Sequence, residues 1–161
     1  MVAATFADFR MTKVGISRIA VDGMDSTEEL LRALGSAEAD AILLDGVCHG
    51  GFNILDPRAI FNSTGIPIII VSEEKPDMPS IRSALEKHFP DWRERWEIIR
   101  RAGGLAPLEV REGETPLYFK AIGAGAAFAK RLLRSLSVNS KLPEPIRASK
   151  LIARGLTSPK Q

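Results

Sequence analysis

The sequence has little of three features that would point to particular classes of protein: cysteine, long apolar runs and excess charge of one sign. Cys48 is the single cysteine, so an internal disulfide and a cysteine-rich metal site are excluded, and a reducing cytoplasm is the expected compartment. The longest apolar run, residues 66–71, contains Pro67 and is far shorter than the roughly 20 residues that cross a bilayer. We therefore expect no membrane span. We also expect no secretory leader, because the first residues lack the basic-then-apolar pattern of one.

Charge is balanced over the whole chain but uneven along it. The net charge is +2, from 22 basic and 20 acidic side chains, which is too weak for a general nucleic-acid coat. From residue 120 onward Glu144 is the one acid. The bases of that segment are Lys120, Lys130, Arg131, Arg134, Lys141, Arg147, Lys150, Arg154 and Lys160. Such a segment can bind phosphates, or can be an ordinary solvated helix face.

The length of 161 residues predicts one domain over residues 1–161. Residues 2–6 and 14–21 are apolar and β-branched around the polar stretch 8–13, which predicts a β-hairpin. The pair Asp25-Ser26 then predicts the start of a helix that ends near Gly35. The first elements are therefore two antiparallel strands and a helix.

A βαβ unit follows. Residues 41–44 and 66–71 have the continuous apolar pattern of strands buried on both faces. Between them, Asp56-Pro57 predicts a helix start and Gly65 its end. Two such strands joined by a helix are parallel, so the fold class expected is α/β, with a mixed sheet flanked by helices.

The second half predicts further helices and strands. They are a helix from Pro79, a helical segment around Trp92 and Trp96 that ends at Gly103, strands at 108–110 and 117–122, and helices at 126–136 and 144–156. The two tryptophans, four residues apart, favour packing against the sheet over stacking on nucleobases.

Asp45 is the leading candidate for chemistry, because sites in such sheets lie beyond the carboxyl ends of parallel strands. It is followed by Gly46 and by a loop with Gly50 and Gly51, where a ligand can approach the backbone closely. Its carboxylate can hold Mg²⁺ or can cap a turn, and the residues alone leave both open.

Two further aspartates end the predicted strand at 14–21. If that strand lies beside the one that ends at Asp45, Asp22 and Asp25 can converge with it on a metal centre. For Asp25 the pattern favours a helix cap, whereas for Asp22 the two interpretations are balanced.

Other polar residues are placed to assist. Lys75 follows the strand at 66–71 and can bind phosphate, whereas its neighbours Glu73 and Glu74 fit solvated acids. His49, in the glycine-rich loop, can act as a general acid or base or can simply be exposed. Cys48 has no orienting partner other than His49, so a thiol nucleophile is not expected.

Seven segments together resemble the endonuclease dU family of archaea, a group related to endonuclease V. They are residues 18–28 (RIAVDGMDSTE), 43–46 (LLDG), 51–53 (GFN), 75–77 (KPD), 84–90 (ALEKHFP), 116–118 (PLY) and 143–147 (PEPIR). The resemblance runs in order from about residue 2 to residue 156. It implies an endonuclease V-like, ribonuclease H-like fold.

The resemblance also implies a metal-dependent endonuclease that cleaves phosphodiester bonds of DNA or RNA, with a role in repair and with Mg²⁺ or Mn²⁺ as cofactor. Asp45 matches the family's strand-end aspartate, and Asp22 and Asp25 match its acidic segment. Lys75 is where endonuclease V carries a lysine, and we assign Lys75 and Arg147 to nucleic-acid phosphates.

The chain departs from the family at its start. Members of the family look as though they begin with an additional strand that carries a Gly-Ile-Asp-Asp type motif, and residues 2–6 correspond to their second strand. Either the start was assigned too late or the protein is shortened. Without that strand we expect weak or no nuclease activity, and an open sheet edge at which another chain can pair. The alternative function is a non-catalytic nucleic-acid-binding or assembly module of the same fold.

Overall fold

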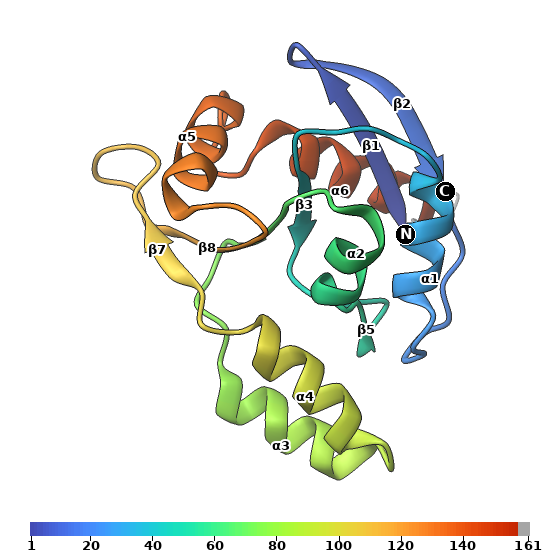
Figure 1. The fold of residues 1–161 in the computed structure, drawn as a ribbon. Coiled ribbons are helices and arrows are strands. Elements are labelled where there is room, and N and C mark those ends of the chain that lie inside the picture. The colour runs from blue at the N-terminus through green and yellow to red at the C-terminus, as the bar shows by residue number, and fades with distance from the viewer. Residues whose placement is uncertain (158–161) are drawn as a thin grey trace.

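The structure is a computed structural model that describes residues 1–157. Its elements, drawn in Figure 1, are β1 (Val2–Ala7), β2 (Arg10–Ile16), α1 (Ser26–Leu34), β3 (Ile42–Asp45), β4 (Cys48–His49), β5 (Asn53–Ile54), α2 (Pro57–Thr64), β6 (Ile68–Ser72), α3 (Met78–His88), α4 (Trp92–Ala102), β7 (Ala106–Leu108), β8 (Leu117–Ile122), α5 (Ala126–Leu136) and α6 (Glu144–Thr157). The predicted α/β class with a mixed sheet and flanking helices is confirmed.

The main sheet has four strands in the order β3-β6-β8-β7. β3 and β6 are parallel, with Asp45 opposite Val71, and β8 is antiparallel to both β6 and β7. The crossover helix α2 begins as the sequence predicts, because the Asp56 carboxylate accepts hydrogen bonds from the backbone of Arg58 and Ala59 at 2.9 and 3.2 Å. The βαβ unit is therefore confirmed.

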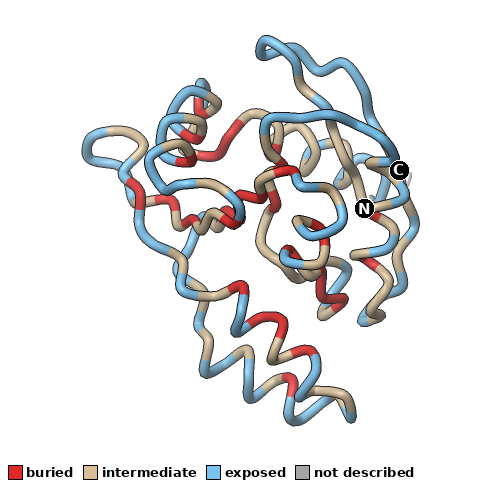
Figure 2. The backbone as a smooth tube through the Cα atoms, in the orientation of Figure 1, coloured by how far each residue is buried: buried red, intermediate tan, exposed pale blue. Residues whose placement is uncertain are grey.

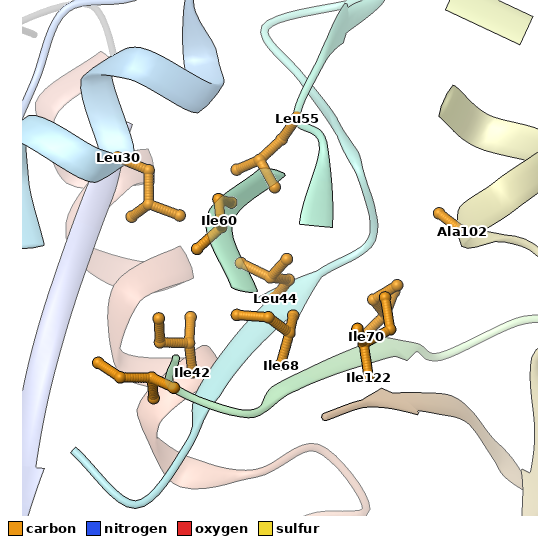
Figure 3. Close-up of a cluster of buried hydrophobic side chains, with 10 residues drawn as sticks. Leu30, Ile42, Leu44, Leu55, Ile60, Ile68, Ile70, Ala102 and Ile122 are labelled. Carbon is orange, nitrogen blue, oxygen red and sulfur yellow. The ribbon is translucent and has the colours of Figure 1, made fainter. Parts of the chain in front are cut away.

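The sheet separates two apolar cores. Alternate residues of β3 and β6 point to opposite faces, so Leu44 and Ile70 join Leu30 of α1 and Ile60 of α2 in one core, shown in Figure 3. The opposite face carries the second core, formed by Ile69, Val71, Ala129, Leu133 and Ile146 together with neighbouring side chains. Helices α5 and α6 thus cover one face and α1 and α2 the other, and the buried stretches in Figure 2 follow the sheet strands between them.

Helices α3 and α4 form a hairpin that extends away from the sheet (Figure 1). A third apolar cluster, with Leu85, Ile98 and Ile99 at its centre, holds the hairpin together. Trp92 and Trp96 pack against that cluster. The prediction of a packing role is confirmed, but their partners are this helical cluster and not the sheet.

The N-terminal hairpin differs from its predicted form. β1 and β2 make a two-stranded sheet of their own, not hydrogen-bonded to β3 within the described chain. Asp8 and Phe9, with φ of 47° and 64°, close the hairpin in a tight turn, so the second strand begins at Arg10. It ends at Ile16, and residues 17–25 are not a strand. The expected strand at 14–21 was wrong in both bounds, because the short turn and the folding of residues 20–25 against a loop were not visible in the pattern.

Within residues 1–157 no helix is both long enough and apolar enough to cross a membrane.

Candidate functional site

Asp45 is the last residue of β3, and its carboxylate lies on the face of the sheet that α6 covers. Gly46, with φ of +69°, turns the chain there while its amide donates a hydrogen bond to the Val71 carbonyl at 2.8 Å. The Asp45 side chain is 37% exposed and bonds to the Lys150 ammonium, with Nζ 3.2 Å from Oδ2 and 3.5 Å from Oδ1. Asp45 is therefore ion-paired and still open to solvent.

Glu73 joins Asp45 through the same lysine. Val71 pairs with Asp45 across the parallel strands, and Glu73 lies two residues further on, so both carboxylates emerge on one face. The Lys150 Nζ lies 2.9 Å from the Glu73 Oε1. We call Asp45, Glu73 and Lys150 the strand-end group. It joins residues from β3, the end of β6 and α6.

The charge of Lys150 is held by its two partners. Partial burial opposes the charge, but the hydrogen bond to Glu73 and the negative charge of Asp45 outweigh it, so the pKa of Lys150 is raised above 10.5. The side chain is 29% exposed. An ammonium has three N–H donors, and two of them face the carboxylates.

A polar hollow of about 350 Å³ borders the strand-end group. Its walls are Glu73, Glu74, Lys75, Thr115, Pro116, Tyr118 and Lys141. The Lys141 ammonium donates to the Glu73 carbonyl at 3.1 Å and to the Thr115 hydroxyl at 2.8 Å, which fixes it at the rim. Lys75, predicted to bind phosphate, therefore lies with a second lysine in a hollow whose wall includes Glu73 of the strand-end group.

Arg147, the other residue assigned to phosphate, lies one helical turn from Lys150 on α6. Its guanidinium bonds to the Glu144 carboxylate at 2.6 and 2.8 Å. This intrahelical pair uses two of its donors and leaves it 41% exposed.

His49 is half-buried on β4 and not simply exposed. Burial lowers its pKa, although the charge of Asp45 opposes that shift, so the imidazole is mainly neutral at pH 7. Within the described chain, its buried Nε2 has no hydrogen-bond partner. Burial raises the pKa of the adjacent Cys48 thiol to about 11, which keeps it protonated and agrees with the expectation that it is not a nucleophile.

The other two predicted metal ligands serve a different purpose. The Asp22 carboxylate accepts a hydrogen bond from the Phe52 amide at 2.8 Å. Asp25 occupies the N-cap position of α1, but its side chain makes no cap bond there; it accepts from the Ala20 amide at 3.1 and 3.2 Å and from the Asn53 side chain. The Asn53 bond is the main cause of the lowered pKa of Asp25, followed by the Ala20 bond. The helix therefore begins where it was predicted to begin, but the prediction that the Asp25 side chain caps it was wrong.

Asn53 and Arg95 complete this arrangement, and neither was predicted. Asn53 is fully buried and bonds to the Ser26 amide at 3.1 Å and the Ala20 carbonyl at 2.8 Å. Arg95 is 5% exposed, pairs with Asp91 and donates to the carbonyls of Gly23 and Phe52 at 3.0 and 2.6 Å. We call Asp22, Asp25, Asn53 and Arg95 the loop clamp, because they tie residues 20–26 and 50–53 to each other and to α4.

The predicted convergence of Asp22, Asp25 and Asp45 on one metal is not found. Asp22 and Asp25 bond to backbone amides of the loop clamp, whereas Asp45 bonds to Lys150. Within residues 1–157, no three His, Cys, Asp or Glu side chains are placed to hold a metal ion. The three aspartates are therefore divided between two regions.

A second cavity is almost wholly apolar. It has a volume of about 190 Å³ and lies between the strand ends and the α3–α4 hairpin. Gly46, Val47 and Cys48 form part of its wall, and Ile70, Met78 and Ile99 form another part. Its lining suits an apolar group and offers no charge to a phosphate.

The fold and the strand-end group define a class: an α/β protein with a mixed sheet and a site of two carboxylates and an ammonium at the carboxyl ends of its parallel strands. The sequence pattern of the family described as "Endonuclease dU" matches residues 1–157. The chain belongs to the endonuclease dU family.

Relatives from archaea support that membership. A "UPF0215 protein" of Methanosarcina mazei is 39% identical over 145 residues, which cover 88% of this chain and 74% of the relative. A "UPF0215 protein" of Thermococcus gammatolerans is 40% identical over 138 residues, covering 84% of this chain and 69% of the relative. The crystal structure of a protein of unknown function from Archaeoglobus fulgidus superposes with a TM-score of 0.82 at 24% identity, covering 96% and 95% of the two chains, and so shows the same fold.

Proposed function

We propose that this chain is an endonuclease-like protein that acts on phosphodiester bonds of DNA or RNA at the strand-end group. The observation that carries the proposal is the convergence of Asp45, Glu73 and Lys150 at the carboxyl ends of two parallel strands, in a member of the endonuclease dU family. Sites in open sheets with parallel strands lie at that edge. The hollow with Lys75 and Lys141 borders it and can receive a phosphate next to the one that reacts.

Hydrolysis of a phosphodiester needs a group that takes a proton from water and positive charge at the phosphate oxygens. The Asp45 carboxylate is exposed enough to meet solvent and is the first candidate to accept the proton. His49, on β4, is a mainly neutral imidazole with a buried Nε2 and is the second candidate. Lys150, with Lys75 and Lys141 in the hollow, supplies the positive charge.

The family resemblance implies Mg²⁺ or Mn²⁺, which when bound activates water and stabilises charge on the leaving oxygen. The residues predicted to hold it do not fit as a set. Asp22 and Asp25 are bonded within the loop clamp, and the Asp45 carboxylate faces an ammonium. The roles above are therefore assigned to side chains alone, and metal dependence remains a prediction for the assay below.

The alternative is a nucleic-acid-binding or assembly module without catalysis. It is favoured by the hollow, whose two lysines do not depend on Asp45. Binding through lysines weakens steeply as salt rises, because it is driven by the release of counterions from the phosphates and that release is less favourable in concentrated salt. This function requires binding that survives Asp45→Asn.

The test is a cleavage assay on end-labelled single- and double-stranded DNA and RNA, with and without deaminated bases, in Mg²⁺, Mn²⁺ and EDTA. We expect weak endonucleolytic cleavage, whose rate falls at least ~100-fold in Asp45→Asn because a proton acceptor is lost. The matched control is Asp40→Asn, an exposed aspartate in the loop before β3. Salt-sensitive binding without cleavage in any condition would replace this proposal with the binding module.

A further inference from the structure

The cation between Asp45 and Glu73 is part of the chain. Lys150 lies 105 residues from Asp45 in sequence, yet α6 packs against β3 and brings its Nζ to 3.2 Å from one carboxylate and 2.9 Å from the other. The contact with Glu73 has the length of a charge-assisted hydrogen bond, and the contact with Asp45 is a slightly longer ion pair. One ammonium thus joins the two carboxylates that end the parallel strands.

A divalent ion would compete for the same oxygens. Mg²⁺ binds carboxylate oxygens at about 2.0–2.1 Å, so an ion shared by Asp45 and Glu73 would lie where Nζ lies now. The two positive charges would also repel each other at that separation. A metal and the Lys150 ammonium therefore cannot occupy the space between these carboxylates together.

The chain offers little to favour the metal in that competition. Two carboxylates are the acidic ligands at this edge, and the Asp22 and Asp25 carboxylates that were predicted to add to them accept backbone hydrogen bonds elsewhere. Displacing Lys150 would leave an ammonium, 29% exposed, without its two ion-pair partners.

We infer that Lys150 is the resident cation of the Asp45–Glu73 pair and takes the place there of the divalent metal that the family resemblance implies. Two of the three N–H donors of the ammonium serve Asp45 and Glu73, and the third can donate to a phosphate oxygen of the substrate. This last role rests on the proposed function. The exclusion of metal by Lys150 does not, since it follows from the ion pairs alone.

Binding of Mn²⁺ to the intact chain, measured by isothermal titration calorimetry and by the loss of the free-ion electron paramagnetic resonance signal, tests the inference without an activity readout. Five proteins are compared: the wild type, Asp45→Asn, Lys150→Met, the double variant Lys150→Met with Asp45→Asn, and Lys130→Met. Methionine keeps most of the length of the lysine stem without its charge. Lys130 is an exposed lysine on α5 and controls for the loss of one positive charge elsewhere.

We expect Lys150→Met to bind Mn²⁺ at least ~10-fold more tightly than the wild type, because a positive charge within hydrogen-bonding distance of both carboxylates is removed. The gain should vanish in the double variant and be absent in Lys130→Met. The inference is overturned if the wild type itself binds Mn²⁺ through Asp45, or if folded Lys150→Met gains no affinity. The wild-type arm decides even if Lys150→Met fails to fold, since Asp45→Asn then shows whether any Mn²⁺ bound by the wild type uses Asp45.

Failure of the two proposals can be distinguished. If Lys150→Met gains Mn²⁺ affinity but no protein cleaves, the proposed endonuclease function is rejected and the role of Lys150 as resident cation is retained. If the wild type cleaves only with Mn²⁺ bound at Asp45, the endonuclease function is retained and the proposed role of Lys150 is rejected.

Discussion

The loop clamp and the strand-end group use the same side-chain chemistry in opposite ways. In the loop clamp, Asp25 and the buried Asn53 bond to backbone groups close by, and Arg95 is almost completely enclosed. In the strand-end group, Asp45 and Glu73 are 37% and 44% exposed and are held by one lysine from a distant helix. A carboxylate whose partners are backbone amides is committed to the fold, whereas one held by a single partly buried ammonium is still open to solvent and to a substrate.

The difference explains why the three aspartates that could converge on one metal centre lie in two separate regions. Asp22 and Asp25 shape the loop that carries Gly50, Gly51 and His49, and the Asp22 carboxylate lies so close to Gly51 that a Cβ there would displace it. Asp45 alone remains at the strand end. The predictions below test whether the loop clamp contributes more to the free energy of unfolding than the strand-end group, whose carboxylates are open to solvent.

The largest effect is expected for Asn53→Ala. The change leaves the buried Ser26 amide without its partner and removes one of the two hydrogen bonds to the Ala20 carbonyl, which should lower the free energy of unfolding by about 2–3 kcal/mol. Urea denaturation monitored by circular dichroism measures it. The control is Asn139→Ala, an exposed asparagine bonded to Glu144, with an expected loss below about 0.5 kcal/mol. If the two variants lose the same free energy of unfolding, the buried bonds of the loop clamp do not stabilise the fold more than an exposed side-chain bond does.

An intermediate effect is expected for Asp25→Asn in acid. The folded state lowers the pKa of Asp25 below 3.8, first through Asn53 and then through the Ala20 amide, so the unfolded state takes up a proton more readily. The stabilisation by Asp25 is therefore present above pH 3.8 and is lost as the pH falls through the lower, folded-state pKa.

Removing this titration should make the urea midpoint of Asp25→Asn less dependent on pH below 3.8 than that of the wild type. Some dependence remains, because the pKa values of Asp77, Asp91, Glu97 and Glu144 are lowered as well. The control Asp40→Asn should follow the wild-type curve. If the urea midpoint of Asp25→Asn depends on pH in acid as steeply as that of the wild type, the hydrogen bonds of Asp25 do not stabilise the folded loop.

The smallest effect on stability is expected for Asp45→Asn. A half-exposed ion pair contributes little, so the free energy of unfolding should change by less than about 1 kcal/mol, even though cleavage should be lost. The same urea experiment measures it. A loss as large as that of Asn53→Ala would show that the strand-end group, too, is committed to the fold.

The fold could be predicted where its signals are local. The cap of α2 by Asp56, the ends of α4 and α5 and the apolar strands β3 and β6 all follow from residues within a few positions. The hairpin was predicted with the wrong second strand, because the positive φ angles of Asp8 and Phe9 depend on packing.

The site could be predicted only in part. Asp45 and Lys75 were found from their positions after strands, but Glu73 was taken for a solvated acid and Lys150 was one base among many in the final quarter. The parallel register gives a signal for Glu73, since it follows its strand two residues beyond the partner of Asp45. Lys150 has no such signal, because its contact joins segments 105 residues apart.

By itself the sequence determined the α/β class, the βαβ unit and the position of Asp45 at the end of a buried strand, since apolar periodicity and caps act over a few residues. Only the tertiary structure decided which aspartates are available. Burial of Asn53 and Arg95 commits Asp22 and Asp25 to the loop, and the packing of α6 places Lys150 against Asp45 and Glu73. The partners of a charged group are the residues that lie near it in space, and separation along the chain does not reveal which residues those are.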